Sequence, residues 1–103
     1  MLGPGKADLL ERIRDTGSIS AAGRSMAMSY KRAWLLVEEM NAAFQAPLVE
    51  SARGGAKGGG AYLTETGEAV LSHYRKLETI VAQAGAAQIE GLLSLRSDVS
   101  SRK

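Results

Sequence analysis

Residues 17–34 read GSISAAGRSMAMSYKRAW, and this stretch decides the fold of the chain. It predicts a short helix, a tight turn and a second helix. The two consecutive alanines are small enough to let another helix approach closely, and Ser29 is a good N-cap for the second helix. That cap places Tyr30, Lys31 and Arg32 in the first helical turn, where their polar groups project from the protein. Such an arrangement is typical of a helix-turn-helix, which inserts its second helix into a DNA major groove.

Two packed helices are predicted, one from the sequence before residue 17 and one from the first half of residues 17–34. Residues 6–15 form the first helix, with apolar side chains at helical spacing. Gly17 ends it, because glycine adopts the left-handed conformation at low cost. The second helix covers residues 20–26 and is capped by Ser18 or Ser20.

A third helix and a hairpin follow. The helix covers residues 30–44, and its core-facing positions recur at helical spacing: Ala33, Trp34, Val37, Met40 and Phe44. Residues 48–51 and 61–63 are predicted strands, and the glycine-rich, basic residues 53–60 connect them. A hairpin directly after a recognition helix is the wing of a winged helix. The expected fold class is therefore mainly α, an α+β winged helix-turn-helix that comprises residues 1–63.

A long helix is expected over residues 64–96, with Thr64 as its N-cap and Gly67 as a weak point near its start. Apolar residues recur along it with heptad-like spacing, which predicts dimerisation with a second copy of the chain. The residues of this stripe are Val70, Tyr74, Leu77, Val81 and Ala84. Residues 97–103 are expected to be a disordered tail.

Composition limits the classes of protein to consider. The chain has 103 residues, which is enough for one small domain, and 45% of them are hydrophobic. No apolar run reaches the roughly 18 residues of a membrane-spanning helix, and the start of the chain lacks the apolar core of a signal peptide. The absence of cysteine agrees with a cytoplasmic protein. A net charge of +2 permits nucleic-acid binding without requiring it, so the positions of the charges decide.

Several motifs together resemble the N-terminal DNA-binding domain of ModE-type, molybdate-responsive transcriptional regulators, which is related to LysR-type regulators. The resemblance covers about residues 3–78, and its motifs are Gly3–Lys6, Gly17–Ala22, Met28–Trp34, Pro47–Glu50 and Leu63–Gly67. It implies a winged helix that dimerises through long helices. Full-length members of the family also carry C-terminal molybdate-binding domains. The chain ends near where those would begin, so we expect a ModE-like regulator without that domain, and molybdate binding is not expected of it.

The helix-turn-helix supplies most of the candidate DNA contacts. Lys31 and Arg32 can donate to guanine O6 and N7 or neutralise phosphates. Without the helix-turn-helix around them, the two residues would be interpreted only as part of a solvent-exposed helix face. Tyr30 either contacts DNA or packs on the second helix. Arg24 lies late in the second helix, where a contact to the DNA backbone is common. Trp34 is expected in the core rather than as a stacking platform for single strands. The candidates in this region are Ser18, Ser20, Arg24, Ser29, Tyr30, Lys31 and Arg32.

Arg53 and Lys57 in the glycine-rich connection are expected to reach a minor groove or its flanking phosphates, unless the connection is only a disordered turn. Under this hypothesis, replacing Lys57 by alanine weakens binding to all DNA sequences alike. The connection is not a nucleotide-binding P-loop, because neither Ser nor Thr follows Lys57.

Catalysis is not expected. His73 is the only histidine, there is no cysteine, and no catalytic constellation or metal site can be assembled, so neither an enzyme nor a cofactor is predicted. Two other functions remain open. One is a winged-helix protein-interaction module that uses its long helix and does not bind DNA. The other is an oxyanion sensor that uses the glycine-rich connection as an anion nest.

Overall fold

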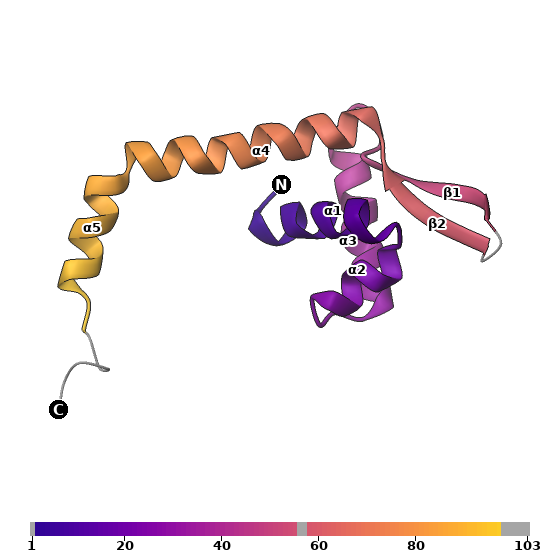
Figure 1. The fold of residues 1–103 in the computed structure, drawn as a ribbon, viewed down its shortest axis with the longest axis horizontal. Coiled ribbons are helices and arrows are strands. Elements are labelled where there is room, and N and C mark those ends of the chain that lie inside the picture. Colours follow the sequence, from indigo (N-terminus) through magenta and orange to yellow (C-terminus); the bar gives the residue numbers. More distant parts are fainter. Residues whose placement is uncertain (1, 56–57, 98–103) are drawn as a thin grey trace.

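The computed structural model describes residues 2–55 and 58–97, and over these it has the predicted winged helix-turn-helix fold (Figure 1). Three helices form the core, a two-stranded antiparallel hairpin follows, and two more helices extend away from the core. In chain order the elements are α1 (Pro4–Thr16), α2 (Ile19–Ser25), α3 (Tyr30–Ala43), β1 (Val49–Gly55), β2 (Gly58–Leu63), α4 (Glu65–Ala84) and α5 (Ala86–Leu95).

The core lies between α1, α2 and α3. Leu9, Leu10 and Ile13 of α1 are completely buried, as their helical spacing predicts. α2 and α3 approach each other closely at Gly23, where a Cβ atom would lie 2.9 Å from the Cβ of Ala33. The small residues of α2 therefore allow the two helices to pack tightly, and this packing fixes the position of α3.

The helix ends follow local chemistry. Gly17 has a φ of 71° and donates its N–H to the Ile13 carbonyl, which ends α1. Of the two serines expected to cap α2, Ser18 does so by accepting from the Ala21 N–H at 3.0 Å. Ser29 accepts from the Arg32 N–H at 3.1 Å and caps α3. These hydrogen bonds satisfy N–H groups that have no partner inside the helix.

The hairpin is attached to the core at its base. Asn41 of α3 donates to the Val49 carbonyl and accepts from the N–H groups of Leu48 and Val49, at 2.8–3.1 Å. On β2, the Ala61 N–H donates to the Gly17 carbonyl at 2.9 Å. The hairpin therefore starts from a fixed point beside both the α1–α2 turn and α3.

Gly67 is not the weak point that its helix propensity predicted. It is buried, and a Cβ atom at this position would overlap the backbone carbonyl of Leu48. Thr64 donates its backbone N–H to the same carbonyl and caps α4 by accepting from the Gly67 N–H at 2.9 Å. Glycine is thus the residue that lets α4 begin directly against the chain segment before β1.

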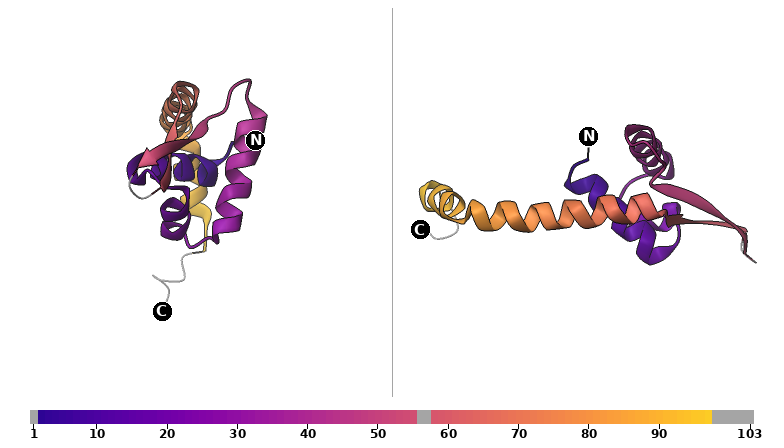
Figure 2. Two further views of the ribbon diagram at one scale, coloured as in Figure 1. Left: turned by 90° about the vertical axis from the view of Figure 1, so that its right-hand side faces the viewer. Right: turned by 90° about the horizontal axis from the view of Figure 1, so that it is seen from above.

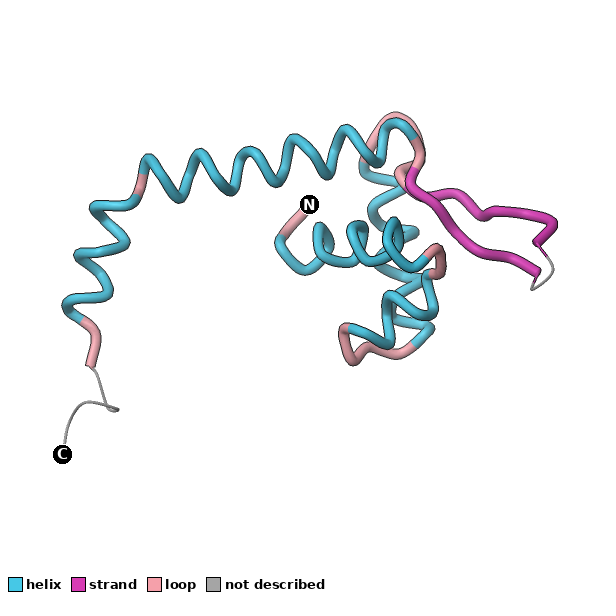
Figure 3. The backbone as a smooth tube through the Cα atoms, in the orientation of Figure 1, coloured by secondary structure: helices cyan, strands magenta, loops and turns pink. Residues whose placement is uncertain are grey.

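The long helix expected over residues 64–96 is two helices. Gly85 has φ −97° and ψ 9°, and the chain bends there so that α5 turns away from the axis of α4 (Figures 1 and 3). Seen from above, α4 extends straight out from the core with α5 at its far end (Figure 2). No residue of α5 is buried. In the described part of the chain, no helix is long and apolar enough to cross a membrane.

Candidate nucleic-acid interface

The first turn of α3 carries exposed donor groups on a buried support. Tyr30 is 61% exposed, and the side chains of Lys31 and Arg32 are exposed as well. On the opposite face, Ala33, Val37 and Met40 are buried as predicted. Over residues 2–55 and 58–97 neither Lys31 nor Arg32 forms an ion pair, and the first turn contains no acidic residue. Both cations are therefore free to meet a ligand.

The aromatic pair of α3 connects this turn to the core. The rings of Tyr30 and Trp34 meet edge to face, with centroids 6.2 Å apart. Trp34 and Phe44 are partly buried against the core rather than within it, and α3 ends at Ala43. Leu36, which the predicted apolar face left out, is buried. Trp34 thus supports Tyr30 from below and is not an open stacking platform.

Three of the candidate residues meet in one hollow. Its volume is about 300 Å³, and it lies between the start of α2, the first turn of α3 and the base of the hairpin. Ser18, Ser20 and Tyr30, all of which carry hydroxyl groups, line it beside Ser51 of β1. Hydroxyl donors at the edge of a recognition helix are groups that commonly contact phosphate.

Arg24 is exposed on α2 and donates to the Ser20 hydroxyl at 2.8 Å, so this cation is held beside the hollow. Arg12 is a further basic residue near the motif and is absent from the predicted set. It donates from α1 to the carbonyl and the hydroxyl of Ser25, at 3.2 and 2.9 Å, at the end of α2. Nothing in the sequence separates Arg12 from an ordinary solvated arginine, because its neighbours come from another helix.

Of the two wing candidates, Arg53 lies in β1, and Lys57 lies outside the described residues. In the described part of the hairpin, Glu50 pairs with Tyr62 across the strands, and the Tyr62 hydroxyl donates to the Glu50 carboxylate at 2.9 Å. This hydrogen bond, together with the negative charge of Glu50, raises the pKa of Tyr62.

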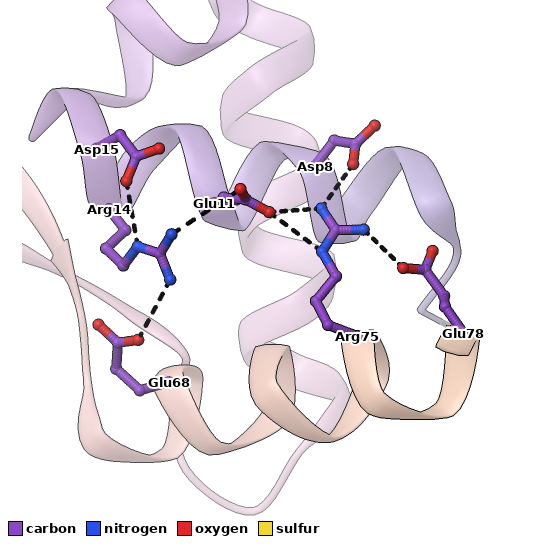
Figure 4. A network of polar contacts seen from close by, with 7 residues as sticks. All are labelled: Asp8, Glu11, Arg14, Asp15, Glu68, Arg75 and Glu78. Carbon is purple, nitrogen blue, oxygen red and sulfur yellow. Dashed lines mark hydrogen bonds and ion pairs between the residues drawn. The ribbon is translucent and has the colours of Figure 1, made fainter. Parts of the chain in front are cut away.

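Five carboxylates of α1 and α4 are gathered in a separate network (Figure 4): Asp8, Glu11, Asp15, Glu68 and Glu78. Arg75 of α4 contacts Asp8 and Glu11 of α1 at 2.7 Å each and Glu78 at 3.0 Å. The hydrogen bonds to Asp8, Glu11 and Glu78 raise the pKa of Arg75 further above its ordinary value. Acidic groups that would repel a phosphate are thus paired between α1 and α4, and none of them lies in the first turn of α3.

The stripe predicted for dimerisation is only partly covered within one chain. Val70 and Tyr74 are partly buried against the core, whereas Leu77 and Val81 are more than half exposed. Two shallow hollows of about 360 and 420 Å³ lie along the stripe. His73 lines the first of them and is exposed. Among the described residues, no group of three His, Cys, Asp or Glu side chains could hold a metal ion.

A helix-turn-helix whose second helix is capped, carries exposed cations and is followed directly by a hairpin defines the class of winged helix-turn-helix domains. Residues 6–68 match the family model of bacterial regulatory helix-turn-helix proteins of the lysR family, and the chain belongs to this family.

Comparison with known proteins confirms the resemblance to ModE-type regulators. The chain is 46% identical over 82 residues to the molybdenum-pterin-binding protein MopB of Rhodobacter capsulatus, which covers 80% of this chain and 30% of MopB. It is 41% identical over 81 residues to the DNA-binding transcriptional dual regulator ModE of Escherichia coli K12, which covers 79% of this chain and 31% of ModE. The chain thus spans about 30% of the length of these curated relatives.

Solved structures agree on the fold. Full-length LTTR LysG of Corynebacterium glutamicum superposes with a TM-score of 0.63 at 26% identity, covering 90% of this chain and 30% of LysG. The DNA-binding domain of CbnR, solved as a DNA complex, superposes with a TM-score of 0.67 over 88% of this chain and 99% of that chain. At 16% identity the CbnR match establishes the common fold alone.

Proposed function

We propose that this chain is the DNA-binding unit of a bacterial transcriptional regulator and that it reads duplex DNA with the first turn of α3. The observation that carries the proposal is the placement of Lys31 and Arg32, which are exposed and unpaired on a helix whose opposite face is buried. The printed description of the E. coli relative, a DNA-binding transcriptional regulator, supports the same function. Since bacterial duplex DNA lies in the cytoplasm, the proposal locates the chain there.

The side chains divide into two roles under this proposal. Arg32 offers a planar pair of donors to guanine O6 and N7, and Lys31 offers a point charge to the same atoms. Ser18, Ser20 and Tyr30, which share one hollow, are placed to hold the phosphate backbone along the groove. Arg24 and Ser29 complete this second group, and Arg53 and Lys57 remain wing candidates. No catalytic role is proposed.

We further propose that two copies dimerise through the stripe Val70, Tyr74, Leu77, Val81 and Ala84. A dimer would present two α3 helices to successive major grooves, about 34 Å apart, and would therefore read an approximately palindromic site. Exposed Leu77 and Val81 support this assignment, because apolar side chains at heptad-like spacing are stabilised by a second helix.

The direct test is retention of duplex DNA by the double variant Lys31→Ala/Arg32→Ala. We expect it to lose both specific and most non-specific binding, measured by fluorescence anisotropy on a random-sequence duplex pool and on selected sites. The matched control is Lys76→Ala/Arg96→Ala, which removes two exposed cations from α4 and from the end of α5 and should leave specific binding nearly unchanged. A wild-type chain that retains no duplex would instead favour the protein-interaction module.

A further inference from the structure

The junction between α4 and the helix-turn-helix core is small. Leu71 is the one apolar residue of α4 that is buried, with Val70 and Tyr74 partly buried beside it. All residues from Thr79 to Ala84 are exposed. A few contacts near the start of α4 must therefore determine the direction in which the rest of the helix leaves the core.

Arg75 is the principal polar link across this junction. Its Nη2 donates to Asp8 Oδ1 and to Glu11 Oε1 at 2.7 Å each, and its Nε donates to the same Glu11 oxygen at 3.1 Å (Figure 4). In the described part of the chain, no residue of α4 that follows Arg75 makes a polar contact with the core. A second link, Arg14 to Glu68, is longer at 3.9 Å and lies nearer the start of α4.

The geometry of these contacts restricts rotation. Asp8 and Glu11 are three residues apart on α1, so they lie on one face about one helical turn apart. A planar guanidinium that bonds both carboxylates resists sliding along α1 as well as turning about it, which a single contact point would allow. Because the side chain is only about one third exposed, the network is partly protected from water and salt.

We infer that Arg75 is a positioning residue that fixes the angle between α4 and the helix-turn-helix core, and that it thereby sets the half-site spacing the dimer accepts. This inference rests on the proposed function. If α4 joins the two protomers, any error in the angle occurs in both of them and changes the separation of the two α3 helices twice. Over a lever arm of about 20 Å, a tilt of about 10° displaces α3 by about 3.5 Å, close to the rise of one base pair.

Two routes remove the link, and one control spares it. Arg75→Ala removes the guanidinium, and Asp8→Asn/Glu11→Gln neutralises its partners on α1 while leaving Arg75 in place. Arg75→Lys keeps the charge and loses the planar pair of donors, so it should restore the behaviour only in part. Glu78→Ala is the matched control, because Glu78 lies on the same helix as Arg75 and does not contact α1.

The first measurement uses duplexes that carry two selected half-sites, with the spacing between them varied by single base pairs. Wild type and Glu78→Ala should prefer one spacing by about tenfold over its neighbours, and Arg75→Ala should reduce this preference to about threefold or less. Affinity for a single half-site and the monomer–dimer equilibrium should change less than about twofold, since neither involves the junction. An unchanged spacing preference in both Arg75→Ala and Asp8→Asn/Glu11→Gln would overturn the inference.

The second measurement does not depend on DNA. The chain contains no cysteine, so Glu38→Cys on α3 and Gln83→Cys on α4 give two unique spin-label sites, both at exposed positions. Labelled chain diluted in excess unlabelled chain reports only distances within one chain. Arg75→Ala should widen the distance distribution about twofold relative to wild type and Glu78→Ala.

The two measurements separate the inference from the proposed function. A distribution that stays narrow in Arg75→Ala refutes the positioning role, whether or not DNA is bound. A distribution that widens while the wild-type chain selects no duplex refutes DNA reading and leaves the role of Arg75 in the junction intact. Circular dichroism of each variant verifies that the helices are retained.

Discussion

At the scale of single residues, the first turn of α3 separates capping from ligand contact. A helix N-terminus leaves N–H groups without partners, and a nearby polar side chain can be used up in satisfying them. Here the Ser29 hydroxyl takes that role. The side chains of Tyr30, Lys31 and Arg32 are exposed in the first turn of the helix. Ser29 thus fixes where the helix begins, and this places the three side chains at its exposed end.

Replacing Lys31 by alanine should weaken binding to the preferred duplex by about 1–3 kcal/mol and relax the preference for one base pair. The reason is that a base contact contributes only when the matching base is present. Anisotropy titrations on the preferred duplex and on single-base variants measure both effects. Lys76→Ala on α4 is the matched lysine control. Equal losses on all duplexes in Lys31→Ala would assign Lys31 to phosphate instead.

The Tyr62–Glu50 pair on the hairpin predicts a pH effect. The Glu50 carboxylate favours the protonated phenol, so folding raises the pKa of Tyr62 above its unfolded value of about 10. The sign follows from linkage: this pair stabilises the fold below the unfolded pKa, and its contribution is lost as pH rises through the folded pKa. Glu50→Gln should therefore move one tyrosinate absorbance step to lower pH, and Tyr62→Phe identifies that step by removing it. Identical titrations of wild type and Glu50→Gln would contradict the assignment.

At the scale of elements, the sequence predicted what is determined locally and missed what depends on distant contacts. Caps at Ser29 and Thr64 and the left-handed Gly17 come from side-chain chemistry within a few residues, and these were predicted correctly. The role of Gly67 was not predictable, because the carbonyl it packs against belongs to Leu48, before the hairpin. The sequence names candidate residues on α2 and α3, which stay predictions, but the hollow that joins Ser18, Ser20 and Tyr30 depends on the tertiary fold.

Gly67→Ala tests the close packing of the start of α4 against the Leu48 carbonyl. In an exposed helix interior the same change is favourable by up to about 1 kcal/mol, because alanine has the higher helix propensity. At Gly67 the sign should reverse, with a loss of about 1–3 kcal/mol or more in the free energy of unfolding, since the added methyl overlaps backbone that cannot move cheaply. Gly91→Ala on α5, which has open space around it, is the control and should be neutral or mildly stabilising. Urea unfolding followed by circular dichroism measures both variants, and a neutral Gly67→Ala would contradict the packing argument.

At the scale of the whole molecule, the chain is elongated, 57 × 32 × 20 Å, because α4 and α5 extend beyond the core. The bend at Gly85 divides the apolar surface into two segments. Leu77 and Val81 lie on α4, and Leu92 and Leu95 on α5 are 71% and 84% exposed. Isolated helices as short as α5 are marginal in water, so α5 needs a further contact for full stability. The heptad-like spacing predicts contacts of this kind along α4, whereas the single helix predicted over residues 64–96 is interrupted at Gly85.

Leu77→Asp/Val81→Asp should convert the proposed dimer into a monomer. Dimerisation would bury the two new carboxylates against the apolar surface of the other protomer, and the loss of their hydration is costly. Sedimentation equilibrium at micromolar concentration should then give one chain per particle. The control Gln83→Asp adds a carboxylate on the opposite face of α4 and should leave association unchanged. The monomeric variant should still bind a single half-site as wild type does, since its α3 is intact, and should lose the gain in affinity that a second half-site provides. If it kept that gain, the two recognition helices would have to be joined by a surface other than α4. If the wild-type chain were itself monomeric under these conditions, the assignment of this stripe to dimerisation would be wrong.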